Sequence, residues 1–213
     1  MTENAIAERI ARQTLARRGP DYASEVRRLL DAGLEVMRKC GTASRPRVTD
    51  IVAAAGLSND AFYRHFASKD ALVAAILEDG TERLVGYLDH QLAKETTPEG
   101  KVRRWVEGVL SQATDDDVAS ATLAVLWNAG GVGDGLVSGR PSASAALAGV
   151  VREPLAELGS AHPDLDATLV AHAVVGALSD HLWQRSRPTS EEIAHIVEFC
   201  VSAAAATAAG RPS

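Results

Sequence analysis

Apolar side chains recur along this chain at the spacing of α-helices. They return every three to four residues, so each series lies on one face of a helix that packs against a core. The five clearest series begin at Val26, Leu72, Val102, Leu147 and Ile193. Strand-like alternation joined by hairpin turns does not stand out anywhere. The pattern therefore predicts an all-α protein.

Two further segments favour helices with less regular patterns. They are residues 164–185, which are rich in small side chains, and residues 115–128. Thr189 followed by Glu192 matches a capping box, in which the two side chains satisfy backbone N–H groups at a helix start. Ser68 can cap the helix that follows it. These signals indicate where two of the predicted helices begin.

Further residues indicate where other helices begin, bend or end. Asp21 or Ser24 could begin the first helix, and Pro154 is expected to kink the helix that starts near Leu147. Residues 130–144 are rich in Gly and Ser and predict a flexible connection. A phosphate-binding loop is the alternative, but the segment lacks a following Lys-Ser/Thr pair and a preceding strand.

Residues 47–70 read RVTDIVAAAGLSNDAFYRHFASKD and contain two short helical runs around Gly56. The first covers residues 49–55, and the second covers residues 58–66 with Ser58 as its expected N-cap. Two short helices joined by a three- to four-residue turn containing Gly form a helix-turn-helix. The second helix of such a motif enters the DNA major groove. The segment therefore predicts a DNA-reading head.

The second short helix has a face suited to this use. Phe62 and Phe66 are four residues apart and are expected to point inward. Asn can pair with adenine and Arg with guanine, while Tyr, His and Lys can reach phosphates. The candidate DNA contacts on and around this helix are Arg45, Arg47, Asn59, Asp60, Tyr63, Arg64, His65 and Lys69.

Two of these candidates also have purely structural interpretations. Asp60 could accept a hydrogen bond from cytosine, or it could lie in the first helical turn only to favour the helix dipole. His65 could be a buried packing residue, although its place between Tyr63 and Lys69 favours a phosphate contact.

The run DIVAAAGLSNDAFYRHFASKDALVAAIL resembles the N-terminal signature of the TetR family of transcriptional regulators. The resemblance extends from near Leu29 to near Leu77, and the rest of the chain is similar only in length and helical character. The matching residues are Asp50, Ile51, Ala55, Gly56, Ser58, Tyr63, His65, Phe66, Ser68, Lys69 and Leu72.

The resemblance implies an all-α subunit with two domains. Residues 21–70 would form a three-helix head that contains the helix-turn-helix, and residues 71–213 a ligand-binding and dimerisation domain. Two helices within residues 164–209 would form the homodimer. It also implies phosphate contacts by Tyr63, His65 and Lys69, positions near base edges for Thr49, Asn59 and Asp60, and a place for Ser58 in the same motif.

The sequence departs from the family pattern in front of the first short helix. Pro46, Arg47 and Val48 stand where a Thr usually caps that helix and touches a phosphate, so Thr49 or an arginine would replace it. Residues 1–20 also lie outside the pattern. Their arginines predict either a basic arm that touches DNA or a frayed terminus.

Charge is divided unevenly along the chain. The formal net charge is −6, which by itself argues against a nucleic-acid partner. Residues 1–70, however, carry 12 Lys and Arg against 9 Asp and Glu, a net of +3, whereas residues 71–213 carry 10 against 19, a net of −9. A basic head on an acidic body is compatible with DNA binding by the head alone.

Several function classes are disfavoured by composition. No apolar run approaches the roughly 20 residues of a membrane span, and the polar N-terminus does not resemble a signal peptide. Cys40 and Cys200 cannot build a disulfide framework, which favours a reducing compartment and a cytoplasmic protein. No His/Cys cluster has metal-site spacing, and we expect neither catalytic residues, a metal nor a cofactor.

Ligand contacts are harder to predict from periodicity. Trp105 lies on an apolar stripe, so core packing is its first interpretation, while Trp127 beside Asn128 suits a mostly apolar pocket with a polar group. The complete set of candidate ligand contacts is Tyr87, His90, Trp105, Trp127, Asn128 and His172.

These observations predict a ligand-responsive transcriptional regulator, most simply a repressor. It would bind double-stranded DNA at a palindromic operator as a homodimer and respond to a small-molecule effector that the residues do not identify. One alternative is a helix-turn-helix regulator controlled by a protein partner. A weaker alternative is an all-α carrier or enzyme.

Overall fold

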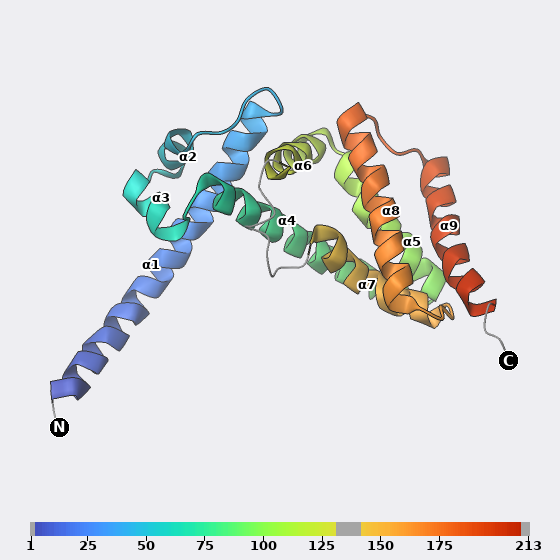
Figure 1. The fold of residues 1–213 in the computed structure, drawn as a ribbon, viewed down its shortest axis with the longest axis horizontal. Coiled ribbons are helices and arrows are strands. Elements are labelled where there is room, and N and C mark those ends of the chain that lie inside the picture. Colours follow the sequence, from blue (N-terminus) through green and yellow to red (C-terminus); the bar gives the residue numbers. More distant parts are fainter. Residues whose placement is uncertain (1–2, 131–141, 210–213) are drawn as a thin grey trace.

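The computed structural model describes residues 3–130 and 142–209, with side chains described between residues 21 and 204 of these ranges. These ranges contain helices and no β-strand, which confirms the all-α prediction (Figure 1). The elements are α1 (Glu3–Cys40), α2 (Val48–Ala55), α3 (Asn59–His65), α4 (Lys69–Leu92), α5 (Pro98–Leu110), the 3-10 turn η1 (Ser111–Ala113), α6 (Asp116–Ala129), α7 (Ala143–Glu157), α8 (Pro163–Gln184) and α9 (Ser190–Ala209).

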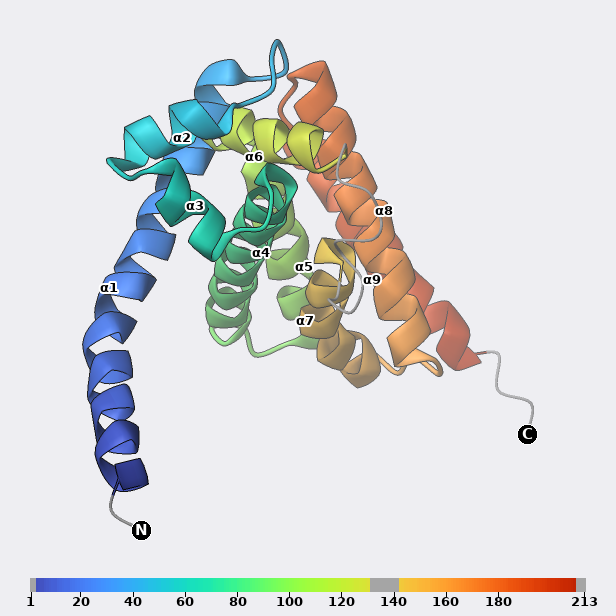
Figure 2. The same cartoon turned by 60° about the vertical axis from the view of Figure 1, so that its left-hand side comes forward.

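The first helix is longer than its cap signals predict. It begins at Glu3 rather than at Asp21 or Ser24, and it continues through Gly19 and Pro20. Residues 3–18 are rich in Ala and Arg, which favour helix strongly enough to extend it. The N-terminal part of α1 projects away from the rest of the molecule (Figures 1 and 2).

The residues expected to form the head, 21–70, contribute most of one hydrophobic core, which we call the head core. Leu29 of α1, Ile51 of α2 and Phe62 of α3 are almost completely buried together. The start of α4 closes this core, because a Cβ at Gly33 would lie only 2.8 Å from Ile76 Cδ1. The helix-turn-helix is thus carried on a rigid support made by α1 and α4.

A second core lies among helices α4 to α9, in the described part of the chain that is expected to form the body. Trp105 of α5 is completely buried at its centre, and its indole N–H donates to the backbone oxygen of Leu147, 3.1 Å away. The two cores share elements, because α4 contributes to both and Ala124 and Val125 of α6 belong to the head core. A movement of α4 or α6 would therefore shift side chains of the head core.

Predicted helix signals recur in the structure. Ser68 accepts a hydrogen bond from the N–H of Ala71, and Thr189 and Glu192 form both bonds of the capping box. Helix α7 continues through Pro154 to Glu157. Most of the predicted connection 130–144 lies outside the described residues. Among the helices that are described, none is long and apolar enough to cross a membrane.

Candidate functional site

The helix-turn-helix is present where the sequence predicts it. Helix α2 ends at Gly56, whose φ of 61° is the left-handed conformation that favours glycine at a helix end. Helix α3 begins after Ser58, whose hydroxyl accepts a hydrogen bond from the N–H of Ala61 at 3.1 Å. Local turn and cap chemistry therefore fixes the angle between the two short helices.

Arg28 of α1 stabilises the turn between α2 and α3 by hydrogen bonds to its backbone. Its Nε donates to the backbone oxygen of Ala55 at 3.0 Å, and its Nη2 donates to that of Gly56 at 2.9 Å. These carbonyl groups lie at the C-terminus of α2, where no helical N–H is left to pair with them. Sequence reasoning missed this residue, because its partners are more than 25 positions away.

Helix α3 presents one face to solvent and the other to the head core. Phe62 and Phe66 are buried, as predicted from their spacing. The side chains on the opposite face are exposed, and Tyr63 keeps 59% of its surface accessible. The exposed group consists of Asn59, Asp60, Tyr63 and Arg64.

Glu25 of α1 connects to the end of α3. Its Oε2 atom lies 2.6 Å from Nε2 of His65 and 3.1 Å from Nη2 of Arg64. The hydrogen bond from His65 and the charge of Arg64 lower the pKa of Glu25 below its ordinary value. Tyr22 completes the cluster, with its ring edge-on to His65 at a centroid distance of 4.1 Å and its hydroxyl donating to the Arg64 carbonyl.

This cluster changes what His65 can do. The His65 side chain has no exposed surface, and its Nδ1 atom is buried without a hydrogen-bond partner. A phosphate cannot reach the ring in this conformation, so the arrangement favours the buried interpretation of His65. Tyr22 and Glu25 precede Leu29 at spacings of three and four residues, so they lie on the same face of α1. This spacing is the signal that could have placed them against the head.

The other predicted DNA contacts lie around the motif. Arg47 precedes α2 without a side-chain cap bond and instead pairs with Asp50 at 3.0 Å. Thr49 is exposed, and Lys69, at the start of α4, is half-buried without an ion pair to any described residue. The Arg45 side chain contacts the body instead, with its guanidinium carbon 5.7 Å from the ring centroid of Trp127 on α6.

The six predicted ligand contacts do not converge on one cavity. Tyr87 and His90 are exposed on α4, and Trp105 is enclosed in the body core. Asn128 is buried but donates to the backbone oxygen of Ala124 in its own helix at 2.8 Å. His172 is exposed on α8, and its Nδ1 lies 2.7 Å from the carbonyl oxygen of Thr168.

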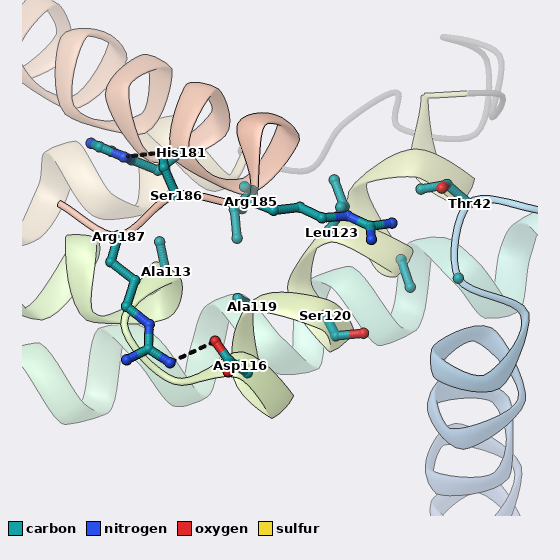
Figure 3. Close-up of a pocket in the computed structure, with 13 residues that line it drawn as sticks. Thr42, Ala113, Asp116, Ala119, Ser120, Leu123, His181, Arg185, Ser186 and Arg187 are labelled. Atoms are coloured by element: carbon teal, nitrogen blue, oxygen red, sulfur yellow. Dashed lines mark hydrogen bonds and ion pairs between the residues drawn. The ribbon is translucent and has the colours of Figure 1, made fainter.

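A cavity of about 280 Å³ lies instead between the head and the end of α8, and we call it the junction cavity. Gly41 and Thr42, just after α1, form one wall, while the others come from η1, from α6 and from the end of α8 with the residues that follow it (Figure 3). None of the six predicted ligand contacts lines it. The lining residues are Gly41, Thr42, Ala113, Asp116, Ala119, Ser120, Leu123, Ala124, His181, Leu182, Arg185, Ser186 and Arg187.

Large apolar side chains are exposed along one face of α8. Leu165, Leu169 and Trp183 follow each other at helical spacing and keep more than half of their surface accessible, as does Phe199 on α9. Among the small residues of 164–185, Ala171 is completely buried within the subunit, whereas Gly176 is exposed on α8.

Comparisons with known proteins agree with this architecture. A family model described as bacterial regulatory proteins, tetR family, matches residues 29–76. An uncharacterized HTH-type transcriptional regulator of Mycobacterium tuberculosis is 30% identical over 192 residues, which cover 87% of this chain and 90% of the relative.

Solved structures share the fold at lower identity. Reduced NemR of Escherichia coli is 16% identical with a TM-score of 0.62, covering 82% of this chain and 95% of NemR. RolR, in complex with its ligand resorcinol, is 16% identical with a TM-score of 0.58, covering 91% of this chain and 97% of RolR. At such identities the likeness extends to the fold alone.

Proposed function

The chain belongs to the TetR family of bacterial regulatory proteins, and from this we infer that it is a ligand-responsive repressor acting on a palindromic operator. Transcriptional regulation is the activity of the family. The repressor role, the operator and the response to a small molecule are proposed here. A DNA target implies that the protein works in the cytoplasm.

The observation that carries the proposal is the exposed face of α3. Asn59, Tyr63 and Arg64 lie together on a helix that is capped at its start and supported by α1. Asn59 is proposed to pair with a base edge, and Tyr63 and Lys69 to contact phosphates. Arg64 would read a guanine after releasing Glu25. Arg45, Arg47, Thr49, Ser58 and Asp60 complete the proposed contact region, and the buried His65 would support it from within.

A homodimer is proposed from the exposed apolar face of α8 and α9. Leu165, Leu169, Trp183 and Phe199 have no cover within the described chain, and an apolar face of this kind marks an interaction surface. A twofold dimer brings the same face of both subunits together, which presents two heads related by the same symmetry. The operator would then be a near-palindrome.

A small-molecule effector is proposed in line with the fold neighbour RolR, which binds resorcinol. Tyr87, His90, Trp105, Trp127, Asn128 and His172 were the contacts expected from sequence. An effector can change DNA binding only by its differential affinity for two arrangements of the heads.

A salt titration of DNA binding tests the regulatory proposal. The full chain is titrated onto the DNA that flanks its own gene and onto a scrambled duplex of equal length. We expect tighter binding to the flanking DNA and an affinity that falls steeply with salt, because phosphate contacts release counterions. Equal binding to both duplexes, or binding without a salt dependence, would contradict the proposal.

A further inference from the structure

The charges that line the junction cavity are not balanced. Arg187 pairs with Asp116 at 2.7 Å, and His181 Nδ1 lies 2.8 Å from the Ser186 hydroxyl. Arg185 is the remaining cation, and it has no ion pair with any described residue. The lining therefore includes one exposed arginine whose charge is not paired with a described carboxylate.

The backbone of Arg185 is unusual as well. It lies at the end of α8 with φ 52° and ψ 39°, and among the described residues it is the sole non-glycine with positive φ. Glycine is the residue that adopts this conformation without a steric cost. A strained arginine at such a position indicates a role for its side chain, which extends toward α6 and Thr42 in Figure 3.

The rest of the lining is small, apolar or hydroxylated. Ala119, Leu123 and Leu182 offer apolar surface, and Ser120 and Thr42 carry hydroxyl groups that can donate or accept hydrogen bonds. At about 280 Å³, the space lies just below the roughly 300 Å³ at which pockets for drug-sized ligands begin. It suits a small molecule with one polar end.

We propose that the junction cavity binds the effector and that this effector carries a carboxylate on a small apolar body. The inference rests on the proposed function, since an effector presupposes a regulator. The carboxylate would pair with the Arg185 guanidinium, whose planar fork matches its two oxygens. The apolar body would lie against Ala119 and Leu123 of α6.

The position of the cavity explains how occupancy reaches the DNA-reading head. One wall is the turn after α1, which belongs to the head, and the others are α6 and the α8 end in the body. Helix α6 also contributes Ala124 and Val125 to the head core. A ligand that fits one relative arrangement of these walls better than another shifts the molecule toward it.

Calorimetric titration of the full chain tests the binding step. The probes are benzoate and hexanoate, their neutral counterparts benzamide and hexanamide, and inorganic phosphate. We expect a carboxylate to bind about tenfold or more tightly than its amide, because a charge-assisted pair replaces a neutral one. Phosphate should bind weakly, since it has no apolar body.

Two variants locate the site. Arg185→Gly removes the guanidinium and fits the left-handed backbone, so the variant should fold at least as well and lose the preference for carboxylates. Arg103→Gln removes an exposed charge of α5 that does not line the cavity, and it should bind benzoate like the wild type. Absence of carboxylate binding, equal binding of amides or of phosphate, or unchanged benzoate binding by Arg185→Gly would overturn the proposal.

A DNA-binding readout separates this inference from the proposed function. Saturating benzoate should change the affinity of the wild type for the flanking DNA but leave that of Arg185→Gly unchanged. A chain that binds no DNA would refute the proposed function, while the calorimetric titration would still report on the cavity. Benzoate that binds without altering DNA affinity would overturn its assignment as an effector site.

Discussion

Glu25 shows how much one carboxylate on α1 can determine about the DNA-reading helix. Its Oε2 atom contacts both the buried His65 and the exposed Arg64, which are consecutive residues of α3. The contact with His65 holds the end of α3 against α1, while the contact with Arg64 keeps a potential base-reading side chain near the protein. Release of Arg64 would therefore accompany DNA binding.

The Glu25→Gln substitution should make stability depend less on pH. The folded pKa of Glu25 is lowered from an unfolded value of about 4.3, so its charge stabilises the fold above that pH. The contribution is lost as pH falls through the folded value. In urea unfolding, wild type should exceed Glu25→Gln in stability at neutral pH, and the gap should close in acid.

Glu82→Gln provides the matched control, because Glu82 is exposed on α4 and no ion pair is described for it. This variant should follow the wild-type pH profile. If Glu25→Gln is less stable than the wild type by the same amount at neutral and acid pH, the packing of the side chain, and not its charge, accounts for the stabilisation.

Lys69→Ala and Asn59→Ala should weaken DNA binding in different ways. Lys69 is placed for a phosphate, so its loss should reduce affinity for all sequences and lower the salt slope by about 1. Asn59→Ala should cost about 1–3 kcal/mol on the specific site and relax selectivity at one base pair. Binding isotherms on specific and random DNA at several salt concentrations measure both effects. An Asn59→Ala loss that is identical on specific and random DNA would refute the proposed orientation of α3.

The residues of α3 divide into those that sequence could place and those that it could not. The burial of Phe62 and the exposure of Tyr63 follow from helical spacing alone. The burial of His65 depends on Glu25, 40 positions away, and a contact at that separation leaves no local pattern. On α9, Cys200 lies at helical spacing on the apolar series that begins at Ile193, and burial raises the pKa of its thiol to about 12.

At the scale of elements, local signals predicted helix starts better than helix extent. Ser58, Ser68 and Thr189 all cap the helices that their side chains indicated, because capping needs partners only three residues away. Helix α1 is longer than predicted because residues that can cap a helix do not end it when the residues before them also favour helix. Helix α6 forms despite its weak pattern, with Asp115 as its N-cap.

Close packing of α4 against α5 depends on Gly108. A Cβ at this position would lie 2.4 Å from Cδ2 of Leu88, a side chain that is completely buried. We expect Gly108→Ala to destabilise the fold by about 1–3 kcal/mol through overpacking. Gly86→Ala, at an open and exposed position of α4, should instead stabilise it by up to about 1 kcal/mol. Urea unfolding of both variants measures this, and equal effects would contradict the packing argument.

The extended start of α1 is expected to act as a basic arm. The sequence places Arg9, Arg12, Arg17 and Arg18 along this helix, and basic arms add phosphate and groove contacts. A chain that lacks residues 1–19 should bind the operator more weakly and with a smaller salt slope. A full-length variant with these arginines changed to Gln separates the loss of charge from the loss of helix. Unchanged affinity and slope in both proteins would exclude the arm.

At the scale of the whole molecule, the junction cavity illustrates what sequence could not supply. Thr42, Ser120 and Arg185 lie on three elements separated by more than 60 positions between consecutive members, and they meet only after the head packs on the body. The predicted candidates were instead aromatic and amide residues chosen for their chemistry. Trp105 serves the body core instead, because the same apolar character suits either purpose.

The exposed face of α8 leads to a prediction about assembly. Leu169 lies on this face and has 60% of its surface accessible. A carboxylate placed there would face its own symmetry mate in a twofold dimer, and two desolvated like charges repel strongly. Leu169→Asp should therefore shift the protein from dimer to monomer in light scattering at micromolar concentration. Its thermal stability at the monomer level should change little, since the side chain is exposed within the subunit.

Operator binding then reports whether the two heads act together. The Leu169→Asp monomer should retain a salt-dependent affinity for a half-site but lose the additional affinity that a second linked head gives a palindrome. Val118→Asp is the control, because Val118 is also exposed and apolar but lies on α6. It should leave both mass and operator affinity unchanged. If Leu169→Asp stays dimeric and binds the palindrome normally, the dimer interface does not include this face of α8. The two heads would then be coupled through a different interface.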